Sequence, residues 1–241
     1  MILNVELSNR HMRETRDFSM TVTELEETIR GYSYKGEGLV KDPVVENTQF
    51  PPIALSFYSY IYEYDSVPSP ETLINIYLSQ HCFSSVSEDK YAVNYGTTKT
   101  IVSKEGLVAR ILRTYPSIVR DLHFYLMVLE SRLFDGVWYS FDDDYHKGID
   151  IKVMYNHKWY NVALMQNTRR SVFFRNKKKY RHFGKNSDVI VVELDKRKSR
   201  SCGDYNLYTE SDVKKYSLRL QNKITTHPCI IRDTNVWLFS F

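Results

Sequence analysis

The fold is decided by the stretch Gly148-Ile149-Asp150-Ile151-Lys152-Val153-Met154-Tyr155, the turn Asn156-His157-Lys158, and the run Trp159-Tyr160-Asn161-Val162-Ala163-Leu164-Met165-Gln166-Asn167-Thr168. Both runs are rich in β-branched and aromatic residues, and the segment between them is short and polar. This pattern predicts two antiparallel strands joined as a hairpin.

The hairpin carries an ionisable residue at the start of its first strand. Because side chains alternate between the two faces of a strand, Asp150 and Lys152 share one face of the first strand. If the turn is centred on His157, Asp150 lies opposite Leu164, and Gln166 is its diagonal neighbour at about 7–8 Å. An acid beside polar groups on a sheet is costly to bury, so we expect a functional reason for it.

The sequence on either side of the hairpin extends the pattern to an α/β fold. A run rich in aromatic residues precedes the hairpin, and an apolar run of strand length follows it. We predict a central mixed β-sheet flanked by helices at 117–134 and 171–183, with strands near 137–141, 149–155, 159–168 and 188–194.

A cationic stretch follows the hairpin, and no acidic residue interrupts it before Asp188. Such a stretch is either an ordinary solvated face or a surface for the phosphate backbone of nucleic acid, and the lack of compensating acids favours the second. The basic side chains that we expect to bind nucleic acid are Arg169, Arg170, Arg175, Lys177, Lys178, Lys179 and Arg181.

The order of these features resembles the core of the PD-(D/E)xK phosphodiesterase superfamily, the restriction endonuclease-like proteins. A helix carrying Glu130 precedes a strand that opens with Gly148-Ile149-Asp150, and a second strand ends in a pair of polar residues around Gln166. The resemblance spans roughly 117–194. It implies a metal-dependent endonuclease that uses Mg²⁺ or Mn²⁺ to cleave phosphodiester bonds.

The resemblance also implies roles for individual side chains. Asp150 would hold the metal, Glu130 or Asp144 would be the second acid, Gln166 would be a neutral oxygen ligand, and Lys152 would replace the missing catalytic lysine. From the residues alone, Glu130 is either a solvated flank of its helix or a site residue. For Asp142-Asp143-Asp144 we favour a solvated turn, because three adjacent acids cannot all face one ion.

The polar pair of the second strand can be aligned with the family motif in two registers. Gln166-Asn167-Thr168 places an amide where the family has an acid, and Leu164-Met165-Gln166 leaves no second ligand on that strand. Either register supports an alternative function. In this alternative the protein is a catalytically inactive nuclease-like fold that binds nucleic acid or a protein partner.

The residues before the core predict a separate N-terminal lobe. We expect this lobe at 1–102 and the nuclease-like core at 103–241. Capping signals predict helices over 21–30 and 70–81, and the aromatic run 53–64 favours a strand. A helix that begins at Ser103 is expected to end at Pro116, and a new helix to begin near Ser117.

Composition limits the class of protein. Among 241 residues, 42% are hydrophobic and 26% are charged, which excludes disordered and collagen-like classes. The net charge is only +4, so the clustering of positive charge carries the signal. Three scattered cysteines and the lack of a long apolar run favour a cytoplasmic protein outside the membrane. We expect nucleic acid as the partner, with DNA as the first choice although the sequence does not distinguish it from RNA, and we leave a homodimer open.

Overall fold

The computed structural model of the chain describes residues 3–9, 12–33, 39, 41–81, 83–95, 98–166, 189–195 and 197–226. Within these residues the protein has a mixed α/β fold, as predicted. The predicted helix 171–183, the cationic side chains from Arg169 to Arg181, and Thr168 lie outside the described residues.

A six-stranded mixed sheet forms the centre of the fold, in the order β2-β1-β6-β7-β8-β9. Two of its pairings are parallel, β1 with β6 and β8 with β9, and the others are antiparallel. The predicted strands near 137–141, 149–155, 159–168 and 188–194 correspond to β6 to β9. The strand bounds are β1 Leu3–Asn9, β2 Met12–Phe18, β6 Gly136–Ser140, β7 Ile151–Tyr155, β8 Lys158–Gln166 and β9 Val189–Leu194.

The hairpin β7–β8 closes through a tighter turn than we predicted. Asn156 and His157 have φ angles of 49° and 59°, and Tyr155 pairs with Lys158, so the turn contains two residues and not three. Two left-handed residues in succession match the right-handed twist of the strands. The register of β7 on β8 is therefore one residue different from our prediction. Extending it by one residue places Asp150 opposite Ala163 and not Leu164.

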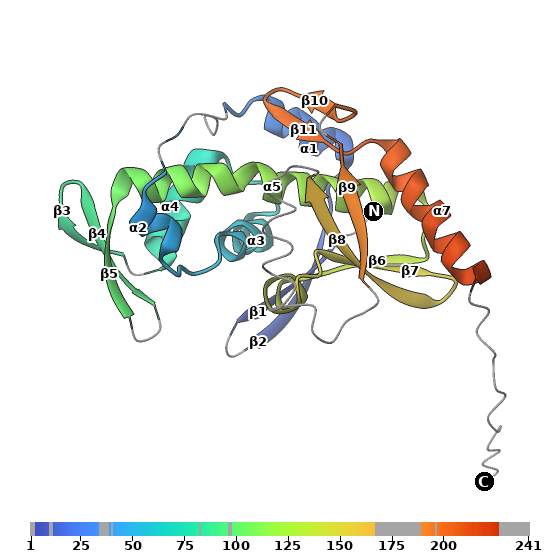
Figure 1. Cartoon of the computed structure of the whole chain (residues 1–241), viewed down its shortest axis with the longest axis horizontal. Coiled ribbons are helices and arrows are strands. Elements are labelled where there is room, and N and C mark those ends of the chain that lie inside the picture. Colours follow the sequence, from blue (N-terminus) through green and yellow to red (C-terminus); the bar gives the residue numbers. More distant parts are fainter. Residues whose placement is uncertain are drawn as a thin grey trace, which may run out of the picture.

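Helices and two small sheets surround the central sheet. Figure 1 shows the long helix α5 running across the molecule, with the β3–β4–β5 sheet at one end and α7 near the other. The helices are α1 Val22–Arg30, α2 Pro43–Asn47, α3 Ile53–Tyr64, α4 Pro70–Gln80, α5 Lys104–Ser131 and α7 Glu210–Thr226. The small sheets contain β3 Ser84–Ser87, β4 Lys90–Tyr95 and β5 Thr98–Ser103, and β10 Arg200–Cys202 with β11 Tyr205–Leu207.

Local capping signals predicted two helices correctly. Thr21 and Glu24 form the complete capping box at the start of α1. Ser69 accepts the N–H of Thr72 at 3.0 Å at the start of α4, where Pro70 occupies the first turn. Each cap satisfies a backbone donor that the first turn of a helix leaves unpaired, so these signals act within a few residues.

The predicted strand over 53–64 is wrong, because these residues form helix α3. Phe57, Tyr58 and Ile61 are buried, whereas Tyr64 is exposed. The buried positions 57 and 58 lie four and three residues before the buried position 61, and this spacing places all three on one face of a helix. The dense aromatic run hid this spacing, since nearly every residue in it is compatible with either structure.

The predicted helix break at Pro116 is also wrong. Helix α5 continues through Pro116 from Lys104 to Ser131. Tyr115 before the proline and Val119 after it are both fully buried, and Thr114 donates its hydroxyl to the carbonyl of Arg110. Proline removes one hydrogen bond from a helix interior, and here the burial on both sides of it offsets that loss.

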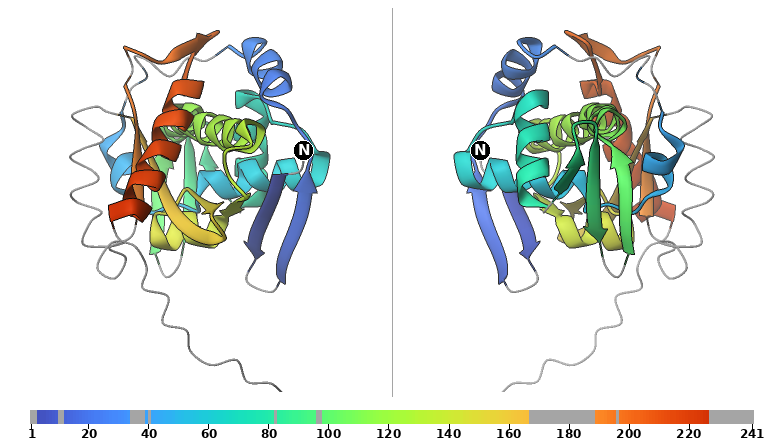
Figure 2. Two further views of the ribbon diagram at one scale, coloured as in Figure 1. Left: turned by 90° about the vertical axis from the view of Figure 1, so that its right-hand side faces the viewer. Right: turned by 90° about the vertical axis from the view of Figure 1, so that its left-hand side faces the viewer.

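Helix α5 lies in the middle of the fold. Both views in Figure 2 look along this helix and show other elements around it. Its residues from Leu122 to Val128 are all buried, so every side of this segment packs against protein. One buried cluster contains residues from both sides of the predicted boundary at 102/103, and β1 pairs with β6 across the same boundary.

Membrane-spanning helices are absent from the described residues. No helix there combines the length and the apolar character that a bilayer span requires.

Candidate functional site

A tight turn of chain carries the first residues of the site. After β6, Asp143–Lys147 form one π-helical turn, here called η1, and Gly148 ends it with φ 66° and ψ 34°. The N–H of Gly148 donates to the carbonyl of Asp144 at 3.0 Å, and the N–H of Ile149 donates to that of Asp143 at 3.0 Å. The acidic run is therefore helical, and Asp143 is buried, which corrects our expectation of a solvated turn.

Replacing Gly148 tests how much the left-handed end of this turn contributes to the stability of the fold. A side chain in the left-handed region costs roughly 1–2 kcal/mol. We therefore expect Gly148→Ala to lower the free energy of unfolding by about 1–2 kcal/mol, measured by urea unfolding. The control is Gly31→Ala, because Gly31 has φ −75° and an added methyl group would meet the carbonyl of Thr28 at an ordinary 3.5 Å. Equal effects of the two changes would contradict this prediction.

Asp143 binds two lysines. Its carboxylate forms ion pairs with Lys147 of η1 and with Lys152 of β7. Burial acts to raise the pKa of Asp143, but the two ammonium groups outweigh burial and the pKa is lowered. Lys152, our candidate for the missing catalytic lysine, is thus held by Asp143 in this structure.

Three other carboxyl groups lie near the buried Tyr58, and two of them also lie near the buried Tyr139. We call them the acid cluster, which consists of Asp121 of α5, Asp144 of η1 and Asp150 before β7. All three raise the pKa of Tyr58, although burial of that phenol is the larger cause. Two predicted site residues, Asp144 and Asp150, are therefore brought into one neighbourhood.

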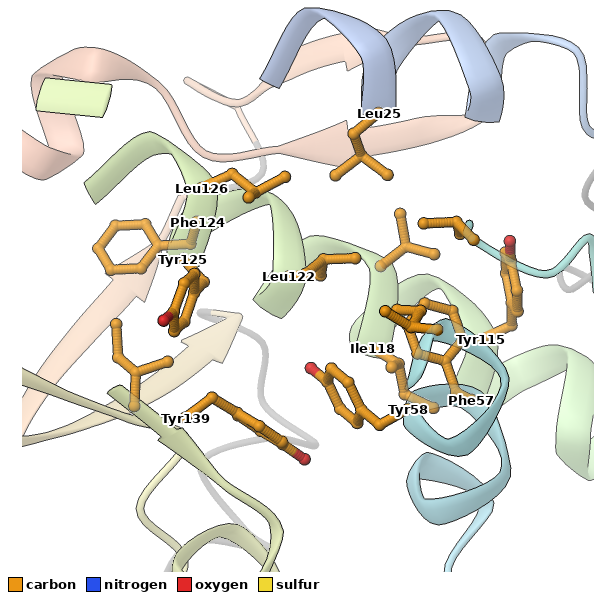
Figure 3. Packing of buried hydrophobic residues seen from close by; sticks show 14 of the residues in the cluster. Leu25, Phe57, Tyr58, Tyr115, Ile118, Leu122, Phe124, Tyr125, Leu126 and Tyr139 are labelled. Carbon is orange, nitrogen blue, oxygen red and sulfur yellow. The ribbon is translucent and has the colours of Figure 1, made fainter. Parts of the chain in front are cut away.

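The two tyrosines connect α3 to the acid cluster. The rings of Tyr58 and Tyr139 lie 4.1 Å apart between centroids, and the hydroxyl of Tyr139 donates to Oδ2 of Asp144 at 3.3 Å. Figure 3 shows both side chains pointing toward one another below α5. Burial raises the pKa of Tyr139, and the charges of Tyr58, Asp144 and Asp150 add to this. Both phenols therefore stay protonated and can act as hydrogen-bond donors at neutral pH.

Asp150 is fixed between the two strands of the hairpin. Its N–H donates to the carbonyl of Val162 at 2.9 Å, and its Oδ2 accepts the N–H of Leu164. The register places Ala163 opposite Asp150 on β8, so the facing side chain offers no oxygen ligand. Gln166, which pairs with Leu194 of β9, is half-buried two residues beyond Leu164.

Glu130 lies at a different place on α5. Its Oε1 accepts the N–H of Val22 at 2.7 Å, at the first turn of α1. Nine residues separate Asp121 from Glu130, which is about two and a half helical turns and about 13 Å along the axis. The carboxyl group that α5 contributes to the acid cluster is therefore that of Asp121, which we did not identify from the sequence. The available signal was its position next to Leu122, which belongs to an apolar stripe at helical spacing formed by Ile118, Leu122, Leu126, Leu129 and Leu133.

The described acids do not complete a metal site by themselves. In the residues that the structure describes, no three His, Cys, Asp or Glu side chains are arranged so that they could hold one ion. The acid cluster offers hard oxygen donors, but two of its members already accept protein hydrogen bonds, Asp144 from Tyr139 and Asp150 from Leu164.

The acid cluster should make folding stability depend on pH. Burial, with a smaller contribution from Asp144, raises the pKa of Asp121 from its ordinary 3.8 to about 7, although Arg120 opposes this. A carboxyl group with a higher pKa in the folded chain binds more protons when folded, so stability falls as pH rises between these two values. We expect Asp121→Asn to be more stable than wild type at pH 8, by about 1–3 kcal/mol, with the difference shrinking toward pH 4.

Urea unfolding of both proteins between pH 4 and pH 8 measures this difference. The control is Asp65→Asn, an exposed acid at the end of α3 whose replacement should give no such trend. A stability difference between Asp121→Asn and wild type that is independent of pH would contradict the prediction.

Comparisons with protein-family models, with curated proteins and with solved structures found no match for this chain.

Proposed function

We propose that this protein is a metal-dependent nuclease that cleaves phosphodiester bonds in nucleic acid, built on a divergent PD-(D/E)xK core. One observation carries the proposal. The chain runs α5, β6, β7, β8 and β9, with β6, β7 and β8 antiparallel and β9 parallel to β8, and an aspartate stands directly before β7. The order and directions of these strands agree with those that the sequence resemblance implies, and in that resemblance Asp150 would be the metal ligand.

The acid cluster supports the proposal through its chemistry. Mg²⁺ in nucleic-acid enzymes is commonly bound by one or two carboxylates together with phosphate oxygens of the substrate. Asp150 with Asp144 or Asp121 would provide such a partial set, and Gln166 a neutral oxygen. Bound Mg²⁺ or Mn²⁺ would lower the pKa of an attacking water and neutralise charge on the scissile phosphate. The half-buried, mutually repelling acids are a physical reason for a cation to bind there.

A second candidate is a nuclease-like fold that binds nucleic acid without cleaving it. Specific observations favour it: Oδ2 of Asp150 already accepts the backbone N–H of Leu164, and Lys152 already forms an ion pair with Asp143. The role of Glu130 as a second acid would require a position different from its contact with α1. Under this candidate the acid cluster has no catalytic role.

The test is incubation of the purified protein with plasmid DNA, single-stranded DNA and RNA in the presence of Mg²⁺, Mn²⁺ or EDTA. We expect cleavage of at least one substrate with a divalent ion and none with EDTA. Binding without cleavage under every condition would favour the second candidate. A protein that neither binds nor cleaves any of these substrates would overturn both.

A further inference from the structure

An exposed aromatic ring stands beside the acid cluster. Tyr145 of η1 is 41% exposed, and its ring is parallel to that of Phe141, with centroids 5.8 Å apart and planes 7° apart. Phe141 is buried, so Tyr145 lies parallel to a ring that the core holds in place. The ring of His146 meets that of Tyr145 edge-on at 4.9 Å. These contacts hold the ring in a defined plane while leaving part of it in solvent.

The position of Tyr145 distinguishes it from other exposed aromatic residues. Tyr64 at the end of α3 and Trp159 on β8 are also exposed. Trp159 pairs with Met154. Met154 is four residues from Asp150, about 13 Å along the strand. Tyr145, by contrast, directly follows Asp144 of the acid cluster on the same turn of chain. A single exposed tyrosine is ordinary on a protein surface, but a supported ring next to candidate site acids is a suitable contact for a substrate.

The charges around Tyr145 indicate which part of a nucleic acid it would contact. Asp142 and Asp144 are close in the chain, and a phosphate would be repelled there unless a cation were bound. The face of a nucleobase carries no net charge and stacks on aromatic rings regardless of its identity. A base inside a duplex is stacked on both sides and must be unstacked, at a cost, before it can use a protein ring.

We propose that Tyr145 is a stacking subsite for an unpaired nucleobase, so that the substrate is single-stranded or contains an unpaired base next to the scissile phosphate. The inference rests on the proposed function and adds a substrate class to it. The subsite positions the strand by one base, and the acid cluster lies one residue away along the chain.

Binding of nucleic acid in the presence of Ca²⁺, a hard cation that carboxylate oxygens can bind, tests the subsite, with the oligonucleotide checked afterwards to be uncut. Fluorescence anisotropy would measure the affinity of the full chain for a short single-stranded oligonucleotide and for a blunt duplex of the same sequence. We expect Tyr145→Ala to weaken binding of the single strand by about tenfold and to leave duplex binding nearly unchanged. Tyr145→Phe should bind like wild type, and Tyr145→Leu should bind like the alanine variant, because the ring and not the hydroxyl is required.

Trp159→Ala is the matched control, since it removes an exposed ring at the distant end of the hairpin. It should leave both affinities unchanged. Wild-type binding of single strands that Tyr145→Ala does not weaken would overturn the subsite and leave the proposed nuclease function standing. Equal losses on single strand and duplex, or a loss in Tyr145→Phe, would also overturn it. A wild-type protein that binds no nucleic acid would remove both the proposed function and the subsite.

Discussion

Asp150→Asn is expected to reduce metal-dependent cleavage by about 100-fold or more, because it removes the negative charge proposed to hold the ion. Asparagine is the informative replacement for structural reasons. Oδ2 of Asp150 accepts the N–H of Leu164, and the amide oxygen of asparagine can keep this hydrogen bond while alanine cannot. The measurement is the initial rate of cleavage in Mg²⁺ or Mn²⁺, with thermal unfolding as a check on the fold.

Asp65→Asn serves as the matched control for this prediction. It makes the same chemical change at an exposed residue that ends α3, and asparagine tolerates the left-handed conformation found there. We expect wild-type rates from this variant. An Asp150→Asn protein that cleaves at the wild-type rate would exclude Asp150 from the catalytic site.

Phe57→Ala is expected to cost about 3–5 kcal/mol of folding free energy, the range for large-to-small changes of a buried phenylalanine. The ring of Phe57 is fully buried and meets the rings of Tyr58 and Tyr115 edge-on at 5.3 Å and 5.9 Å. Because Tyr58 contacts Tyr139 at the acid cluster, the loss of Phe57 should also loosen the wall of the candidate site. Urea unfolding measures the change in stability.

The control for this prediction lies on the same helix. Tyr64 is 57% exposed, so Tyr64→Ala should change the free energy of unfolding by less than about 0.5 kcal/mol. If the two variants were equally stable, α3 would not pack against α5 as the structure has it.

The hairpin illustrates how much of the site could be predicted. Its two strands follow from local composition, and the structure confirms them. The first strand begins at Ile151, so Asp150 stands directly before it and not inside it as we predicted. The register could not be predicted, because a two-residue and a three-residue turn are both compatible with Asn156-His157-Lys158. A shift of one residue in the pairing changes which residue of β8 lies opposite Asp150. Amino-acid composition does not determine this shift, so the residue opposite Asp150 could not be predicted.

Helix α5 illustrates why the second acid was missed. An apolar stripe on a helix identifies the buried side only when another side is exposed. Here all residues from Leu122 to Val128 are buried, so the apolar stripe does not show whether Asp121 or Glu130 faces the candidate site. Asp121 and Glu130 lie on opposite sides of the helix, and only the packing of α1 and α3 decides which of them lies near Tyr58.

By itself the sequence determined the features that depend on neighbours within a few residues. These are the capped starts of α1 and α4, the strands of the hairpin, and the α/β class that they imply. Tertiary structure alone decided that 53–64 is a helix, that α5 passes through Pro116, and that Asp121, Asp144 and Asp150 all lie near Tyr58. The physical reason is that burial free energy depends on contacts between distant segments, and it outweighs local preferences of a few tenths to a few kcal/mol.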